Sequence, residues 1–210
     1  MDAVESFDLR SYISKYRGLT RIFRLKHVIS IQPSKETYEL LLDEIKTTYW
    51  VEMYADVYEK YKSNGGDVAF DEAYLSHAKE EYSVQLDKIE KDLNVARSTS
   101  NKESLRRNHI EKGNLLYLRG DFNEAMNQYL RSRDYIGKPE HSTELALLVS
   151  CLAIDSQNYR HASQQANKID VPTSTPLVAA KTRALTGLLA LTDGNYRTAA
   201  NHFMEVDSAI

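Results

Sequence analysis

Histidine, cysteine and acidic residues are the side chains that could bind a metal or carry acid/base chemistry in this sequence. The six histidines are scattered and form neither a His-x-His nor a His-Glu-x-x-His pattern. Adjacent carboxylates, such as those of Asp43 and Glu44, point to different faces of a helix and are typical of a solvated surface. No glycine-rich segment matches a phosphate-binding loop. The sequence therefore predicts no catalytic residue, no metal site and no cofactor, and hence a protein that is not an enzyme.

Cys151 is the single cysteine, so an intramolecular disulfide and a multi-cysteine metal cluster are both excluded. It stands beside Leu152, a setting that is typical of a small buried hydrophobe. No apolar run approaches the roughly 20 residues of a membrane-spanning helix, and the acidic start of the chain has no apolar signal core. These features predict an intracellular, soluble protein that does not contact a membrane.

Four arginines near the start of the chain are candidate partner-binding residues: Arg10, Arg17, Arg21 and Arg24. On one continuous helix their spacing would place them within about 60° of one another, beside an apolar face. One interpretation is a docking strip for an acidic partner or a phosphorylated ligand. The alternative is that these arginines pair with acidic helices of the same chain, and the spacing leaves both open.

Arg131 and Arg133 form a second basic cluster, near the predicted end of a helix. Cations stabilise a helix C-terminus, so their charge has a simple structural use as well as a partner-binding one. The formal net charge of the chain is −3, and the first arginine group has no exposed aromatic residues interleaved with it for base stacking. The sequence therefore does not favour nucleic acid as a partner.

The elements that must position these residues are predicted to be helices. The chain has only 8 glycines and 4 prolines, and residues 1–35 carry a net charge of +4 whereas residues 36–95 carry −9. Apolar residues at helical spacing predict helices over about 8–30, 34–62 and 67–98. Ser34, Asp67 and a Ser100/Glu103 capping box are the predicted helix starts.

The second half of the chain carries an internal repeat with a period of 37 residues. The equivalent positions are Gly113, Ser150 and Gly187; Gly120, Gln157 and Gly194; Asp121, Asn158 and Asn195; Phe122, Tyr159 and Tyr196; and Ala125, Ala162 and Ala199. Each unit is predicted to be a helical hairpin, with small residues where its two helices cross. The aromatic residue after the turn is predicted to fill the gap between neighbouring hairpins.

This pattern is typical of tetratricopeptide-like repeats and predicts an all-α, right-handed superhelix of helical hairpins. Residues 1–99 form a helical section, and residues 100–210 form three repeats, of which Ser142 opens the second and Thr175 with Pro176 the third. Asn114 suits a contact to a peptide carboxylate. Leu148 and Cys151 stand where further polar donors would be needed, which disfavours that mode of peptide capture.

Two segments resemble a known family. Residues 16–25 resemble the Tyr-x-Gly-x-x-(Lys/Arg)-Ile-x-Arg-Leu stretch of the subunit-one family of the COP-nine signalosome, and residues 113–135 contain the Tyr-Leu-Arg-Ser-Arg-Asp-Tyr run that resembles that family's motif after its first clear repeat. The repeat alone is shared with the related subunit of the proteasome lid. Both belong to the wider PCI family (proteasome, signalosome, initiation factor).

The resemblance implies a non-catalytic scaffold subunit, found in cytoplasm and nucleus, of the complex that removes Nedd8 from cullins. Its implied partners are other signalosome subunits and components of cullin-RING ubiquitin ligases. Family members continue into a C-terminal PCI domain, so residues 1–210 are expected to correspond to the N-terminal helical arm. A proteasome-lid scaffold subunit and a free-standing peptide-binding repeat protein are the two alternatives.

Overall fold

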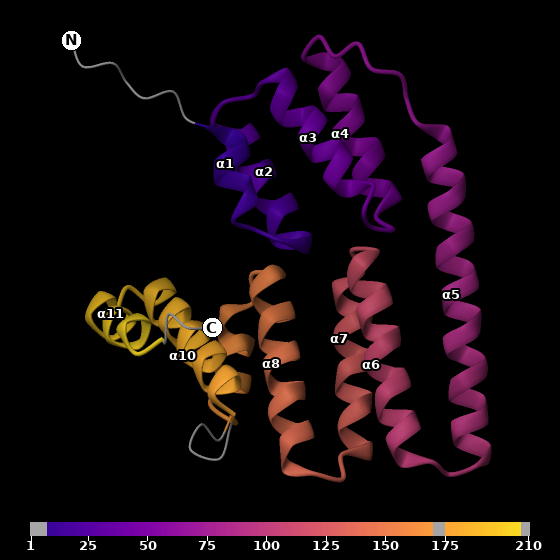
Figure 1. Ribbon diagram of the computed structural model, residues 1–210, viewed down its shortest axis with the longest axis vertical. Coiled ribbons are helices and arrows are strands. Elements are labelled where there is room, and N and C mark those ends of the chain that lie inside the picture. Colours follow the sequence, from indigo (N-terminus) through magenta and orange to yellow (C-terminus); the bar gives the residue numbers. More distant parts are fainter. Residues whose placement is uncertain (1–7, 170–174, 207–210) are drawn as a thin grey trace. The chain divides into compact units, whose positions relative to one another are not determined.

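The computed structural model describes residues 8–169 and 175–206, and within these ranges every regular element is a helix (Figure 1). This confirms the predicted all-α class. The helices are α1 (Leu9–Ser14), α2 (Gly18–Ile31), α3 (Lys35–Ile45), α4 (Val51–Ser63), α5 (Glu72–Ser98), α6 (Lys102–Leu118), α7 (Phe122–Ser132), the short 3₁₀ helix η1 (Arg133–Tyr135), α8 (Pro139–Asp155), α9 (Tyr159–Ala166), α10 (Pro176–Thr192) and α11 (Tyr196–Met204).

Two compact units make up the chain. The first comprises residues 1–86 with 118–120, and the second comprises residues 87–117 with 121–210. The division along the sequence therefore falls inside α5, whereas the boundary predicted from the sequence, residue 99, is where α5 ends. Each unit is described below by itself.

The first unit begins with two helices where a single one was predicted. α1 ends at Ser14 and α2 begins at Gly18, whose φ of +56° lies in the left-handed region that glycine adopts most readily. The prediction of one helix over 8–30 is wrong because this turn redirects the chain. Ile13 before the turn and Leu19 and Ile22 after it are all buried, so both short helices contribute to the same core.

The predicted helix over 34–62 is likewise two helices, α3 and α4. Ser34 caps α3 as predicted, accepting a hydrogen bond from the backbone N–H of Thr37. Between the helices, the buried Thr48 hydroxyl donates to the carbonyl of Ile45 at 2.7 Å and accepts from the N–H of Trp50 at 3.2 Å. Threonine side chains compete in this way with backbone helical bonds, which accounts for the interruption.

The start of α5 also differs from the prediction. Asp71 is the residue whose carboxylate accepts from a first-turn N–H, that of Tyr74, at 2.9 Å. Asp67, the predicted cap, instead pairs with Lys35 at 2.6 Å. Tyr74 reaches back to the end of α3, where its hydroxyl donates to the carbonyls of Ile45 and Thr48, and burial raises its pKa to about 12.

Tyrosines form much of the core of the first unit. Tyr54, Tyr58 and Tyr61 of α4 are buried, and Tyr54 packs against Tyr74 with ring centroids 5.0 Å apart. Aromatic rings contribute large apolar areas to a core. The high tyrosine content of the sequence, 14 residues, is thus used partly for packing.

The 37-residue repeat is visible in the backbone hydrogen bonds of the second half of the chain. The turn residue of each hairpin has a positive φ, namely Gly120 at +84°, Gln157 at +60° and Gly194 at +73°. The next residue caps the second helix of the hairpin through its side chain in every repeat: Asp121, Asn158 and Asn195. The N–H groups of these three residues donate to the carbonyls of Leu116, Ala153 and Ala190, which are again 37 residues apart. The turns and caps therefore recur at a spacing of 37 residues.

The small residues lie at the helix crossings, as predicted. A Cβ on Gly113 would lie 2.4 Å from the Tyr129 ring, and a Cβ on Gly187 would lie 2.6 Å from the Phe203 ring. In the middle repeat, Ser150 is fully buried and its hydroxyl donates to the carbonyl of Ala146 at 2.7 Å. The alanine column is buried throughout, with Ala125 and Ala162 at 0% exposure and Ala199 at 2%.

The aromatic column fulfils its predicted role in the first repeat, where Phe122 packs against the apolar cluster that contains Leu116 and Tyr129. Tyr159 is 39% exposed, so the prediction that it fills the gap between the second and third hairpins is wrong. Tyr196 is 72% exposed, and no hairpin follows α11 within the described residues, so its predicted role stays a prediction.

Two predicted helix starts are also wrong, and one is right. Ser100 has a φ of +51° and precedes the cap, which is Asn101, the acceptor for the N–H of Ser104 at 3.1 Å. α8 begins at Pro139 rather than at Ser142, because proline fits the first turn of a helix. Thr175 caps α10 ahead of Pro176, as predicted.

Candidate protein-interaction surfaces

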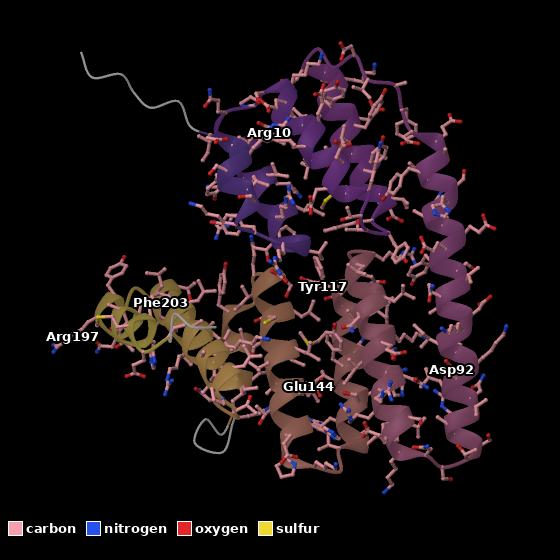
Figure 2. All side chains as sticks on the ribbon, in the orientation of Figure 1. Arg10, Asp92, Tyr117, Glu144, Arg197 and Phe203 are labelled. Carbon is pink, nitrogen blue, oxygen red and sulfur yellow. The ribbon has the colours of Figure 1, made fainter. Side chains whose placement is uncertain are left out.

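Two of the four predicted arginines of the first unit pair with α3. Arg10 on α1, labelled in Figure 2, lies with its Nε 3.0 Å from Glu36, and the Nε of Arg21 on α2 lies 3.2 Å from Glu44. These contacts agree with intramolecular pairing to the acidic helix that follows. Both pairs leave the arginines partly exposed, so each contributes little to stability, about 1 kcal/mol or less.

The other two arginines of this group have no carboxylate partner among the described residues. The Arg24 guanidinium lies over the Tyr16 ring, 5.2 Å from its centroid. Arg17 stands at the N-cap of α2, exposed, with no ion pair or side-chain hydrogen bond to any residue within 8–169 or 175–206. Because α1 and α2 are separate helices, the four arginines do not share one helix face; only Arg21 and Arg24 lie on the same helix.

Arg131 and Arg133 lie at the end of α7 and in η1, both exposed and without an ion pair in the described part of the chain. Arg131 lies near a buried histidine, His109. His109 lies with its Nδ1 3.0 Å from the amide oxygen of Gln128. Burial lowers the pKa of His109, and the positive charge of Arg131 lowers it further. Arg131 thus acts electrostatically on its surroundings, and both arginines lie at the C-terminal end of α7.

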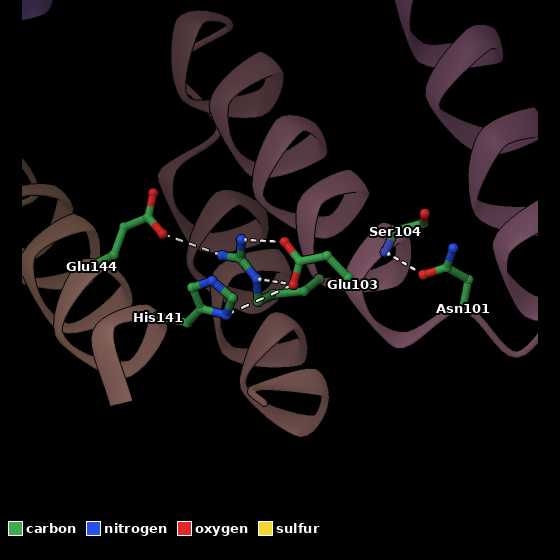
Figure 3. A network of polar contacts seen from close by, with 6 residues as sticks. Asn101, Glu103, Ser104, His141 and Glu144 are labelled. Carbon is green, nitrogen blue, oxygen red and sulfur yellow. Dashed lines mark hydrogen bonds and ion pairs between the residues drawn. The ribbon is translucent and has the colours of Figure 1, made fainter. Parts of the chain in front are cut away.

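A buried arginine that the sequence did not reveal joins α6 to α8 (Figure 3). Arg106, with its side chain 8% exposed, donates to Glu103 at 2.8 and 3.1 Å and to Glu144 at 3.3 Å. His141 Nδ1 lies 3.7 Å from the same Glu103 carboxylate. The hydrogen bond from Arg106 lowers the pKa of Glu103. Glu103 lies three residues before Arg106, a visible local signal, but Glu144 is 38 residues away and no local pattern indicates it.

A second polar contact, which is half-buried, links the same two helices. The Tyr117 hydroxyl, on α6, donates to the Asp155 carboxylate on α8 at 2.5 Å (Tyr117 is labelled in Figure 2). Burial raises the pKa of Asp155, and the hydrogen bond from Tyr117 opposes that shift. The pair fixes the register of the first two repeats.

Asn114 is the residue whose position in the sequence is compatible with binding the carboxylate of a peptide. Its side chain is exposed on α6, and its amide oxygen accepts a hydrogen bond from the Tyr129 hydroxyl at 2.6 Å. The amide is therefore tied to the hairpin's own second helix. Leu148 and Cys151, the residues that disfavour that mode of capture, line an apolar groove together. Cys151 is exposed there, so the expectation of a small buried hydrophobe is wrong, because α8 turns this position toward the groove opening and not into the hairpin core.

Over residues 8–169 and 175–206, no group of three or more histidine, cysteine, aspartate or glutamate side chains is placed to hold a metal ion. Within the same ranges, no helix has the length and apolar character to cross a bilayer.

The fold and the exposed charges together define the chain as a helical-repeat protein with surfaces suited to protein contacts. It belongs to the family described as 26S proteasome subunit RPN7, whose sequence profile matches residues 71–210. This agrees with the PCI-family resemblance found in the sequence.

Curated relatives extend the similarity to nearly the whole chain, and they carry the name COP9 signalosome complex subunit 1. The protein of that name from Arabidopsis thaliana is 28% identical over 97% of this chain and 48% of its own length. The relative from Drosophila melanogaster, subunit 1b, is 24% identical over 96% of this chain and 50% of its own. That from Emericella nidulans is 24% identical over 100% of this chain and 44% of its own. The chain thus spans about half the length of these relatives.

Proposed function

We propose that this protein is a non-catalytic scaffold subunit of a signalosome, the complex that removes Nedd8 from cullin-RING ubiquitin ligases. The observation that carries the proposal is similarity along nearly the entire chain to proteins named as subunit 1 of that complex. Its partners are then the other signalosome subunits and components of the cullin-RING ligases. Its compartments are the cytoplasm and the nucleus, which a fluorescent fusion in living cells would check.

The hairpin array supports this role by providing a preformed contact surface. Each hairpin is fixed by its own turn, cap and crossing residues, so a partner that docks on it does not need to order the backbone. Arg17, Arg131 and Arg133 are exposed and form no ion pair with a described carboxylate. Acidic surfaces of partner subunits are therefore the chemistry that these positions suit.

The deciding experiment is isolation of the tagged protein from its own cells, with identification of the proteins that co-purify. Signalosome subunits in stoichiometric amounts are the expected result. Proteasome-lid subunits in their place would overturn the proposal in favour of the second candidate, a lid scaffold subunit, which the RPN7 family match favours. Recovery of the protein alone, together with capture of acidic C-terminal peptides, would instead indicate a free-standing peptide-binding protein.

A further inference from the structure

An apolar groove of about 690 Å³ lies between α8 and α10, the first helices of the second and third repeats. Leu148 and Cys151 contribute to one wall, and Leu185 and Leu188 contribute to the other. Leu188 is 36% exposed, so the groove opens to solvent.

Charged side chains stand within this apolar lining. Glu140 of α8 and Lys181 of α10 both line the groove, and neither forms an ion pair or a hydrogen bond with a residue in the described ranges. Glu144, the other acidic residue of the lining, is already bonded to Arg106. The groove therefore offers one unpaired anion and one unpaired cation around an apolar floor.

The pKa of the Cys151 thiol is affected by the charged groups near the groove. Although Cys151 is exposed, the protein atoms packed around its thiol and the nearby Asp155 carboxylate raise its pKa, while the positive charge of Lys181 lowers it. The Lys181 ammonium is thus close enough to the groove floor to act on it electrostatically. Apolar surface surrounded by specific charges is typical of a site for an amphipathic segment rather than for a purely apolar molecule.

We propose that this groove binds an amphipathic helix of a partner protein. The apolar face of that helix packs on Leu148 and Leu188, a basic residue pairs with Glu140, and an acidic residue pairs with Lys181. Both walls are helices of 17 residues, long enough for a docked helix of about four turns. The proposal rests on the scaffold function and adds to it the chemistry of one segment that the scaffold holds.

A synthetic probe tests the groove without knowledge of the natural partner. It is a pair of fluorescein-labelled, 16-residue helical peptides. Each has leucines every three or four residues, so that they share one helix face, with a lysine near one end and a glutamate near the middle. The second peptide has the reversed sequence of the first. Fluorescence anisotropy with the full chain is expected to show saturable binding by one direction. A peptide with lysine and glutamate interchanged is expected to bind about tenfold more weakly, which is about 1.4 kcal/mol.

Matched variants locate the binding. Leu188→Gln is expected to weaken binding at least about tenfold, since it removes an apolar contact of the groove. Leu191→Gln is the control, because Leu191 is also on α10 and is 44% exposed but does not line the groove. The double variant E140K/K181E is expected to reverse the preference between the two charge patterns. Equal effects of the two leucine variants, or a preference that does not reverse, would overturn the proposal.

The assembled complex provides a second readout that does not depend on the choice of peptide. Cys151 is the only cysteine of the chain, so its reaction with N-ethylmaleimide measures access to the groove. We expect the thiol to react at least about tenfold more slowly in the purified complex than in the isolated chain. Equal rates would contradict occupancy by a partner helix, even if signalosome subunits co-purify and the proposed function stands. Sedimentation shows whether the isolated chain associates with itself. If self-association slows the reaction of the thiol, and if Leu188→Gln abolishes that self-association, the groove would be assigned to a second copy of this chain instead.

Discussion

At the scale of single residues, the availability of a charge depends on what already neutralises it. Arg10 and Arg21 face carboxylates of α3, whereas Arg17 has no such partner in the described part of the chain. The spacing of these arginines in the sequence does not distinguish them, because it places all of them on the same face of one predicted helix. Only Arg17 can be changed without breaking an observed intramolecular contact, which makes it the cleanest test of partner binding in this unit.

Arg17→Glu is expected to weaken association with co-purifying subunits about tenfold and to leave the helical circular dichroism signal unchanged. The reason is that a positive charge at the rim of an interface attracts an acidic partner surface, whereas a negative charge there repels it. The affinity of the isolated variant for its partner subunits is the measurement. Lys26→Glu is the control, since it makes the same change of charge at another exposed position of α2. Equal effects of the two variants, or none from either, would show that Arg17 has no specific partner.

Asp155 is expected to make the second unit less stable as the pH rises. Its pKa is raised in the folded chain, so the folded state binds a proton more readily than the unfolded state does. Stability therefore falls as the pH rises from the unfolded pKa, about 3.9, through the folded one. Asp155→Asn should raise the urea midpoint at pH 7 and give a smaller gain near pH 4.

Tyr117→Phe is the companion variant to that test. It removes the hydroxyl that donates to Asp155 and leaves the buried carboxylate without this donor, so it should lower the midpoint at pH 7 more than at pH 4. A midpoint that responds to neither substitution, or whose pH dependence has the opposite sign, would contradict the electrostatic role given to Asp155.

At the scale of elements, each helical hairpin is specified by a turn, a cap and a crossing. The turn needs a left-handed residue, the cap needs a short polar acceptor, and the crossing needs a small residue. These demands are met locally, so they recur at fixed spacing and are readable in the sequence. The consequences of changing them nevertheless differ between repeats, because the surrounding side chains differ.

Gly113→Ala should destabilise the chain by about 1 to 3 kcal/mol, whereas Gly187→Ala should cost less than about 1 kcal/mol. The Cβ at position 113 would meet the Tyr129 ring, which is buried and held by its hydrogen bond to Asn114. The Phe203 ring that a Cβ at position 187 would meet is 42% exposed and can move away. Chemical denaturation of both variants checks the order, and equal costs would contradict this account.

Gln157→Gly should stabilise the chain by about 1 kcal/mol. Gln157 has a φ of +60° at the turn position that glycine occupies in the other two repeats, and a residue with a Cβ is strained in this region. Thermal unfolding of the variant is the measurement, with Ser156→Gly as the control, since Ser156 has a φ of −86° and is under no such strain. A lower melting temperature for Gln157→Gly would show that its side chain makes a contact worth more than the strain.

At the scale of the whole molecule, an array of repeats depends on the interfaces between neighbours. In the second unit, successive repeats are joined by apolar clusters and by two polar contacts between α6 and α8. Arg106 is the buried member of one of these contacts. Its two carboxylate partners are about half exposed. Water can therefore solvate the carboxylates if the arginine is removed, whereas the buried guanidinium would lose its counterions if the carboxylates were removed.

The double variant E103Q/E144Q should therefore be less stable than Arg106→Met. The first leaves a buried cation without its counterions, whereas the second removes the charge and keeps most of the apolar volume. We expect a difference of about 1 to 2 kcal/mol in the free energy of unfolding, from urea titrations near pH 7. The reverse order would show that the half-exposed carboxylates, and not the arginine, depend on the network.

The sequence by itself determined the helical class, the 37-residue register and the family resemblance, because caps, turns and small crossing residues act through neighbours close along the chain. It also contained Gly18 and Thr48, the residues at the two unpredicted helix breaks, but apolar periodicity over longer stretches outweighed those single local signals. Only the tertiary structure decided that Arg21 meets Glu44, that Arg106 joins Glu144 and that Leu148 faces Leu188 across a groove. These contacts join residues more than 20 positions apart, and helix packing, rather than any local spacing, brings them together.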